Sequence, residues 1–513
     1  MDKPPSPSLS EAVEVRPTLS RTEEIFEHWR RTVGLFLGPV AGLVVYLLPF
    51  GNLQSHRLAS ILAWVITWWV TEPVPIPVAA LLGVILCVVS GVAPATKAFA
   101  PLADPIIYLF LGSFLIARAM SVHGLDKRFA FGIMSLDFIG NSSFRLLLAY
   151  GMAAAGVSMW ISNTATTAML APIGIGIIGV MARASTAEQG QGRFASGFLL
   201  MAAYAASAGG IGTPIGTPPN LIGLALIEKS TGVHIPFFQW TALAFPCLLA
   251  ILLALFGLLY LLHKPESDEI VGSREYVRSQ LTALGPWNRA QKNTLVAFLV
   301  AVTLWVTPGF LALIWGVDST FMKTYNTRIP ESIAALIGAL LLFVIPVDWP
   351  RRVFTLNWKQ ASGIDWGTLI LFGAGVSLGN LMFETGLAES VGKGILKVAG
   401  TTSLEGLMLV AIVAAIVVSE ATSNTASANM IVPVMISIAM AAKMNPIPPA
   451  IGATLGASWG FMLPVSTPPN AIVYGTGFIP ITRMIRAGFI FDILGALILW
   501  LGLVILLPVV GLW

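Results

Sequence analysis

Long apolar stretches separated by short polar connections run along almost the whole chain. A stretch of ~18 or more apolar residues is long enough to cross the ~30 Å hydrocarbon core of a membrane as a helix. Two stretches, 144–181 and 404–441, are interrupted in the middle by the polar residues Ser-Asn-Thr. Eleven further stretches fall near 33–50, 58–72, 76–92, 104–121, 194–226, 238–262, 293–312, 330–346, 365–382, 447–477 and 484–511. The pattern predicts an all-α polytopic membrane protein of about eleven transmembrane helices and two re-entrant hairpins.

Two polar motifs occur twice. Ser-Asn-Thr-Ala at 162–165 returns at 423–426, and Thr-Pro-Pro-Asn at 217–220 returns at 467–470. Further identical pairs lie 261 positions apart: Asp104 and Asp365, Gly112 and Gly373, Ser158 and Ser419, Pro172 and Pro433. Because five spans and one hairpin make an odd number of crossings, the two copies must run through the membrane in opposite directions. We therefore expect two inverted repeats with a binding site where they meet.

The boundaries of the expected parts follow from these patterns. Residues 1–32 are rich in Pro, Ser and acidic residues, which predicts a disordered cytoplasmic tail. The other parts are an extra first span at 33–50, a first repeat at 51–262, a cytoplasmic linker at 263–292 and a second repeat at 293–513. The first repeat should contain scaffold spans at 58–92, the hairpin 144–181 and a broken helix at 194–226. The second should contain scaffold spans at 293–346, the hairpin 404–441 and a broken helix at 447–477.

Composition supports a membrane protein and argues against several other classes. The 513 residues are 56% hydrophobic and 11% charged, against roughly 25% charged residues in a soluble domain. The net charge of +4 belongs to the loops, so nucleic-acid binding is not expected. Cys87 and Cys247 lie in separate apolar runs and should be small buried side chains, not a disulfide or a metal site. The motifs contain no metal-ligand cluster and no pair of nucleophile and base, which argues against a transition-metal site and an enzyme.

The distribution of Lys and Arg residues indicates the orientation. If the N-terminus is cytoplasmic, 21 of the 29 basic residues fall on the cytoplasmic side and 8 fall outside. Such a bias is typical of membrane proteins, whose cytoplasmic loops are enriched in Lys and Arg. The sequence thus predicts a multi-pass protein of the plasma (inner) membrane with a cytoplasmic N-terminus and an external C-terminus.

Each Ser-Asn-Thr motif is expected to form the tip of its hairpin. Ser, Asn and Thr side chains accept hydrogen bonds from the first N–H groups of a helix, so they favour a helix start. The N-terminus of the second hairpin helix would then face the middle of the membrane, where its free N–H groups and its dipole attract an anion. A polar turn that only stabilises helix packing is the alternative.

Each Thr-Pro-Pro-Asn motif is expected to unwind a helix. Proline lacks an N–H group and disfavours the α conformation of the preceding residue, so the helices should break at Thr217 and Thr467. Unwound carbonyl groups within a membrane are tolerated where they line a cavity, and there they are good ligands for Na⁺. A simple proline kink is the alternative.

Few charged residues lie within the apolar stretches. Glu420 precedes the second Ser-Asn-Thr by three residues, and its counterpart in the first repeat is Met159. Acidic residues within a membrane are functional candidates, so Glu420 is either a structural hydrogen-bond partner or a coupling residue. Four aspartates near the ends of predicted spans are expected to cap helices: Asp104, Asp126, Asp365 and Asp492.

These motifs resemble those of the divalent anion:sodium symporter family, the sodium-coupled carriers of di- and tricarboxylates and sulfate. The resemblance rests on the runs Met159–Met169 and Thr71–Pro77, on Ser423-Asn424-Thr425 and on both Thr-Pro-Pro-Asn motifs. It extends over nearly everything after residue 33. It implies an elevator-type transporter that forms a homodimer in membrane lipid, with Na⁺ as the co-transported ion and no organic cofactor. The chain departs from the family at Ala421, where Phe is common, and at Ser466, where Ala is common.

The resemblance also implies the site residues. One Na⁺ site uses Ser158, Asn163 and Gly216, and the other uses Ser419, Thr422, Asn424 and Ser466. The small dianionic substrate lies between the hairpin tips, where it contacts Ser162, Asn163, Thr164, Thr217, Ser423, Asn424, Thr425, Thr467 and Pro468. No Arg or Lys belongs to this set, so bound Na⁺ supplies the charge that compensates the dianion.

The predicted function is import of a C4-type dicarboxylate of the succinate, malate or fumarate class, coupled to two or more Na⁺ ions by an elevator mechanism. Three alternatives stay open. One is a Na⁺-independent dicarboxylate exchanger of the same fold, one is citrate or sulfate as the substrate, and one is an anion channel built on a transporter scaffold.

Overall fold

Helices make up nearly all of the structure. A computed structural model describes residues 21–48, 51–184, 192–316, 319–399 and 403–513. Ten helices in these ranges are long and apolar enough to cross a membrane, and the bent pair of helices between Thr320 and Val344 makes an eleventh. Three of the ten are arms of the two hairpins, which leaves the count of spans a prediction, while the all-α membrane fold is confirmed.

The described part of the chain begins with a long helix. α1 spans Arg21–Leu47, so residues 21–32 of the expected tail are helical, and residues 1–20 lie outside the described residues. The stretch 21–32 contains Glu and Arg but no Pro, and Ile25 and Trp29 lie one turn apart, so it can extend the first span as a helix. The next elements are α2 (Leu53–Thr71), α3 (Ile76–Val89), α4 (Ala95–Phe99), η1 (Ala100–Ala103), α5 (Pro105–Val122) and α6 (Leu125–Met134).

The two hairpins break where the Ser-Asn-Thr motifs predict. The first consists of α7 (Ser143–Ser158) and α8 (Asn163–Ala184), and the second consists of α19 (Leu404–Ala421) and α20 (Asn424–Ala441). In each hairpin the second arm begins at the Asn of the motif. The duplicated sequence therefore folds into duplicated local structure.

The two broken helices also match their motifs. The first consists of α9 (Arg193–Gly209), η3 (Gly210–Gly212) and α10 (Pro218–Thr231), and the second consists of α21 (Ile447–Gly456) and α22 (Pro468–Tyr474). Both helices resume at the first Pro, since Pro fits the first helical turn, where its missing N–H group is not needed. The unwound segments of both helices are thus followed at once by a new helix N-terminus.

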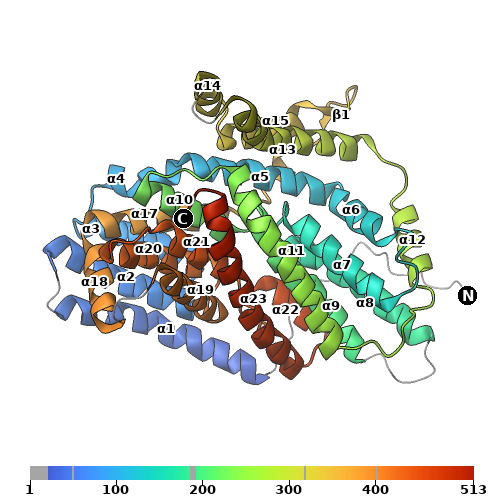
Figure 1. Cartoon of the computed structure of the whole chain (residues 1–513), viewed down its shortest axis with the longest axis horizontal. Helices are drawn as coiled ribbons and strands as arrows, with labels where there is room; N and C mark the ends of the chain where they lie inside the picture. The colour runs from blue at the N-terminus through green and yellow to red at the C-terminus, as the bar shows by residue number, and fades with distance from the viewer. Residues whose placement is uncertain (1–20, 49–50, 185–191, 317–318, 400–402) are drawn as a thin grey trace, which may run out of the picture.

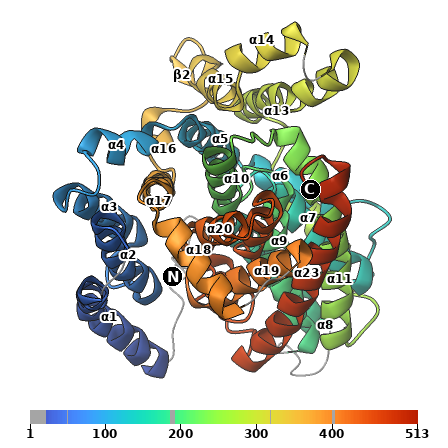
Figure 2. The ribbon, with the colours of Figure 1, turned by 60° about the vertical axis from the view of Figure 1, so that its left-hand side comes forward.

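The remaining elements connect and enclose these units (Figure 1). They are α11 (Phe237–Leu262), α12 (Ser273–Ala283), α13 (Arg289–Trp315), α14 (Thr320–Arg328), α15 (Glu331–Val344), β1 (Pro346–Asp348), β2 (Val353–Phe354), α16 (Trp358–Ala361), α17 (Trp366–Glu384), α18 (Leu387–Ala399) and α23 (Ile481–Val509). The two strands form a small antiparallel ribbon. Figure 2 shows α1, α2 and α3 on one side of the hairpin bundle and α13, α14 and α15 at its end.

The core is organised around α9, which is buried along its whole length. Many of its residues are Ala, Gly or Ser, and small side chains let neighbouring helices approach closely. A Cβ added to Gly209 would lie 2.4 Å from the carbonyl oxygen of Ala155 in α7, so only glycine fits this contact. Tyr204 donates a hydrogen bond to the carbonyl oxygen of Phe461 (2.7 Å), which ties the first repeat to the second.

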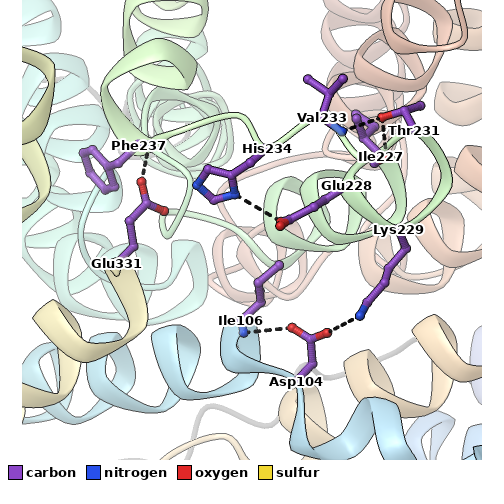
Figure 3. A network of polar contacts seen from close by, with 10 residues as sticks. All are labelled: Asp104, Ile106, Ile227, Glu228, Lys229, Thr231, Val233, His234, Phe237 and Glu331. Atoms are coloured by element: carbon purple, nitrogen blue, oxygen red, sulfur yellow. Dashed lines mark hydrogen bonds and ion pairs between the residues drawn. The ribbon is translucent and has the colours of Figure 1, made fainter. Parts of the chain in front are cut away.

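Polar side chains hold the connection between α10 and α11 against neighbouring helices, as Figure 3 shows. Lys229 Nζ lies 3.3 Å from Asp104 Oδ2, and Asp104 also caps α5 by accepting a hydrogen bond from Ile106. His234 Nδ1 lies 3.1 Å from Glu228 Oε2, and the backbone N–H of Phe237 donates to Glu331 at the start of α15. These contacts join the α10–α11 connection to α5 and α15.

The contact between His234 and Glu228 makes stability depend on pH. Its hydrogen bond raises the pKa of His234 above the usual 6.5, helped by the charges of Glu331 and Glu228 and opposed by burial. A group with a raised pKa stabilises the folded state below its unfolded pKa, and this contribution is lost as the pH rises through the folded pKa. We therefore expect the His234→Gln variant in detergent to lose a component of thermal stability that wild type shows below about pH 6.5 and loses above it. The component should be below about 1 kcal/mol because both side chains are half-exposed.

The matched control is His28→Gln, which changes an exposed histidine on α1. It should keep the pH dependence of wild type. Identical pH profiles of melting temperature for wild type and His234→Gln would contradict the assignment.

Candidate functional site

The four motifs meet around one cavity of about 710 Å³. All nine residues predicted to contact the substrate line it, and they come from both hairpin tips and both broken helices. They are Ser162, Asn163, Thr164, Thr217, Ser423, Asn424, Thr425, Thr467 and Pro468. Gly216 and Ser466 line the same cavity. Segments that lie about 250 residues apart in the chain are thereby brought to one place.

A serine caps the second arm of each hairpin. Ser162 Oγ accepts a hydrogen bond from the N–H of Ala165 (3.3 Å), and Ser423 Oγ accepts one from the N–H of Ala426 (3.2 Å). These bonds explain why α8 and α20 begin at the following Asn. The N-termini of both helices lie at the cavity, where their partial positive charge favours an anion.

A buried serine holds the Asn of each tip. Ser158 Oγ donates to Asn163 Oδ1 (2.7 Å), and Ser419 Oγ donates to Asn424 Oδ1 (2.9 Å). Both serines are fully buried and lie behind the cavity wall. The same pair of atoms is therefore joined in each repeat, and both Asn residues line the cavity.

The residues of the first predicted Na⁺ site lie close together. A Cβ added to Gly210 would lie 2.6 Å from Asn163 Oδ1, so the Asn163 amide packs directly on the unwound backbone. A Cβ added to Gly216 would lie 2.5 Å from the carbonyl oxygen of Gly210. Ser158 and Asn163 thus lie against the unwound backbone to which Gly216 belongs, and side-chain and backbone oxygens are the kind of ligand that Na⁺ binds.

The second predicted Na⁺ site has a similar arrangement. A Cβ added to Gly460 would lie 3.2 Å from Ser419 Oγ and 3.4 Å from the Cβ of Ser466. Ser419 Oγ also donates to the carbonyl oxygen of Ala457 (2.9 Å). Thr422 ends α19 and donates its hydroxyl to the carbonyl oxygen of Val418 in its own helix (2.9 Å).

Sequence reasoning missed the role of the Asn in each Thr-Pro-Pro-Asn motif. Asn220 Nδ2 donates to the carbonyl oxygens of Gly210 (3.0 Å) and Thr213 (2.8 Å). Asn470 Nδ2 makes the same two bonds, to residues ten and seven positions earlier, at 3.1 and 3.0 Å. Each amide closes its unwound segment into a fixed loop. Its place in a duplicated motif was the signal that could have revealed it.

Glu420 is a structural hydrogen-bond partner in this fold. Its Oε1 accepts from the N–H groups of Phe461 (2.5 Å) and Met462 (2.8 Å), which lie in the unwound part of the second broken helix. The first repeat uses Thr213, whose hydroxyl donates to the carbonyl oxygen of Met159 (2.5 Å). The unwound loop is thus stabilised by a carboxylate in the second repeat and by a hydroxyl group in the first.

Two of the four expected aspartate caps are confirmed, at Asp104 and Asp365. Asp126 lies in the first turn of α6. The prediction is wrong for Asp492, because α23 starts at Ile481 and places this residue three turns inside the helix. Asp492 is buried there beside Glu420.

The cavity extends toward one end of α5. Its wall includes Arg118 and Ser121 near the C-terminus of α5, together with residues 363–365 before α17. The polar contacts of Figure 3 lie at Asp104, at the opposite end of α5. Residues at the C-terminal end of α5 thus line the cavity, whereas the ion pairs at Asp104 lie at the N-terminal end of the same helix.

The chain is similar to known proteins over nearly its whole length. The family model for the sodium:sulfate symporter transmembrane region matches residues 29–513. A sodium-dependent dicarboxylate transporter SdcS from Staphylococcus saprophyticus is 33% identical over 484 residues, covering 93% of this chain and 91% of the relative. The protein of the same name from Staphylococcus aureus is 31% identical over 491 residues, with the same shares covered.

A solved structure has a similar fold. It is the crystal structure of the YdaH transporter of Alcanivorax borkumensis, which matches with a TM-score of 0.52. Sequence identity is 15%, and the match covers 94% of this chain and 97% of that one. At this identity the likeness concerns the fold alone.

The two asparagine clamps predict a symmetric effect on stability. Replacing Asn220 or Asn470 by Leu leaves two buried carbonyl groups without their donor, which should cost about 1–3 kcal/mol for each variant. A fall in melting temperature in detergent, similar for both variants, checks this. Asn326→Leu on the exposed face of α14 is the control and should melt like wild type. Wild-type melting of both clamp variants would show that the loops hold their shape without them.

Proposed function

Because the chain belongs to the sodium:sulfate symporter family, whose members are transporters and not enzymes, we propose that it imports a C4-type dicarboxylate with two or more Na⁺ ions. The single observation that carries this proposal is the meeting of both hairpin tips at one cavity, with a Ser–Asn pair behind each tip. The names of the relatives from Staphylococcus support a dicarboxylate as the substrate. The description of the family supports sulfate as the second candidate.

Cation and anion binding would depend on each other. The tips contain no cationic side chain, and moving a dianion from water into a low-dielectric site costs several kcal/mol. Na⁺ held by Ser158, Asn163 and Gly216 would offset part of this cost at the first tip. A second Na⁺ held by Ser419, Thr422, Asn424 and Ser466 would do so at the other. In this mechanism Na⁺ binds first, orders the tips and so creates affinity for the dianion.

The asymmetry of the structure supports alternating access. The Lys and Arg bias favours a cytoplasmic N-terminus, and in that orientation the end of α5 that carries Arg118 would face the cytoplasm while the contacts of Figure 3 would lie outside. Transport then requires the hairpin bundle to move past the helices that carry Asp104 and Glu331. An elevator movement within a homodimer in the plasma membrane fits this requirement and is part of the proposal.

Uptake of radiolabelled succinate into proteoliposomes tests the function. Wild type should accumulate succinate only with an inward Na⁺ gradient. Uptake that ignores Na⁺ and requires preloaded dicarboxylate would show an exchanger instead, and conductance far above carrier turnover would show a channel. Competition by unlabelled sulfate or citrate identifies the alternative substrates.

Two substitutions test the site in the same assay. Asn163→Ala and Asn424→Ala should each lower Na⁺-driven uptake by at least about tenfold, because each removes a Na⁺ ligand and a group at the tip. Both variants should remain folded, which the melting temperature checks. Asn326→Ala is the control and should transport like wild type. Undiminished uptake by both tip variants would remove the proposed site.

A further inference from the structure

One fixed positive charge lies in the wall of the cavity. Of the described residues that line it, Arg118 and Asp365 alone carry charged side chains. Arg118 comes from α5, which belongs to neither hairpin nor broken helix. The sequence motifs give no sign of it, because Arg118 lies outside both hairpin tips and the tips contain no cation.

Within the described residues, Arg118 and the neighbouring Asp365 do not form an ion pair. Asp365 caps α17, with one oxygen accepting from the N–H of Thr368 (3.0 Å) and the other from the Thr368 hydroxyl. In the described part of the chain Arg118 forms no ion pair with Asp365 or with any other carboxylate. An arginine beside a cavity, when it is not engaged in an ion pair, is suited to bind an anion.

The guanidinium of Arg118 is held in a fixed orientation. Its Nε donates to the carbonyl oxygen of Gln360 (3.1 Å), and Gln360 is itself held by a capping box with Asn357. The guanidinium also packs on Gly363, where an added Cβ would lie 3.0 Å from Nη2 and 3.2 Å from Cζ. One N–H is thus used for positioning. Neither terminal nitrogen has a hydrogen-bond partner within the described residues, which leaves both for a planar, two-oxygen ligand.

The repeat does not duplicate this residue. The position 261 residues after Arg118, in α17, is Gly379. A cation on one side of a pseudo-symmetric site attracts the bound dianion only when the hairpin tips face that side. The dianion would therefore meet different electrostatic surroundings in the two orientations of the carrier.

We propose that Arg118 binds a carboxylate of the transported dianion in the orientation where the cavity is open, as a specificity-determining residue for the proposed transport. The inference rests on the proposed function, because the anion in question is the substrate. Arg118 would form a charge-assisted, bidentate contact at the α5 wall of the cavity while the tips bind the other end of the molecule. It would favour dianions over monoanions and slow their release.

Equilibrium binding of radiolabelled succinate to the purified protein at saturating Na⁺ tests this. Arg118→Gln should weaken succinate binding by about tenfold or more, since it removes a hydrogen bond to a charged group. The succinate affinity of Arg118→Lys should lie between those of wild type and Arg118→Gln, because lysine keeps the positive charge but lacks the planar guanidinium. At a succinate concentration that saturates each variant, the Na⁺ concentration for half-maximal binding should stay within about twofold of wild type, because Arg118 belongs to neither Na⁺ cluster.

Gly363→Ala provides a variant that leaves Arg118 in place. The added methyl group would crowd the guanidinium and shift it by a few tenths of an ångström from its bidentate geometry, so this variant should also weaken succinate binding. The control is Arg57→Gln, whose guanidinium donates to the carbonyl oxygen of Ser90 away from the cavity. It should bind succinate like wild type.

The outcomes separate the inference from the proposed function. Wild-type affinity in folded Arg118→Gln and Gly363→Ala would overturn the role of Arg118, and so would a lower melting temperature with unchanged affinity in the folded fraction. If wild type binds labelled sulfate and no succinate, the proposed substrate is wrong. The same comparison of variants with sulfate then still tests Arg118, because its chemistry recognises any compact oxyanion.

Discussion

The structure depends on one constraint, which is that backbone N–H and C=O groups inside a membrane have to find partners within the protein. Two hairpins and two helices are interrupted at membrane depth, and every interruption frees such groups. Ser162 and Ser423 cap the new helix starts, while Asn220 and Asn470 bind the carbonyl groups of the unwound loops. The residues of these interruptions also line the cavity, so the features that satisfy the freed backbone groups and the features of the candidate site come from the same short segments.

Duplication explains most of this site, and the departures from it are informative. The Ser–Asn pairs and the asparagine clamps are the same in both repeats to within a few tenths of an ångström. The supports around them differ, because Thr213 holds one loop and Glu420 holds the other. A site of two equal halves has no preferred direction. Unequal supports and the lone Arg118 make the two halves, and hence the two sides of the membrane, distinguishable.

Much of this could be predicted because the informative residues act locally. Ser-Asn-Thr starts a helix and Thr-Pro-Pro interrupts one through local effects. The predicted boundaries of the hairpins and broken helices therefore lie within a few residues of the observed ones. Contacts between distant segments could not be predicted in this way. Arg118 meets Gln360 and Gly363 only after α5 and α17 have packed, and Asp492 lies beside Glu420 only through the packing of α23. The start of α1 was misjudged because polar residues can extend a membrane helix into water, where hydrophobicity gives no signal.

The burial of α9 has a consequence for how this sequence can drift. No residue of α9 beyond its first faces lipid or water, so volume and not polarity limits what each position can hold. Enlarging a packed Ala or Gly there would cost roughly 1–3 kcal/mol, whereas most positions of α1 are exposed and can exchange one apolar residue for another at little cost. Related sequences should therefore diverge fastest at the lipid-facing rim and slowest along this central helix. The rate of substitution along the chain would then trace the layers of the molecule from the outside inward.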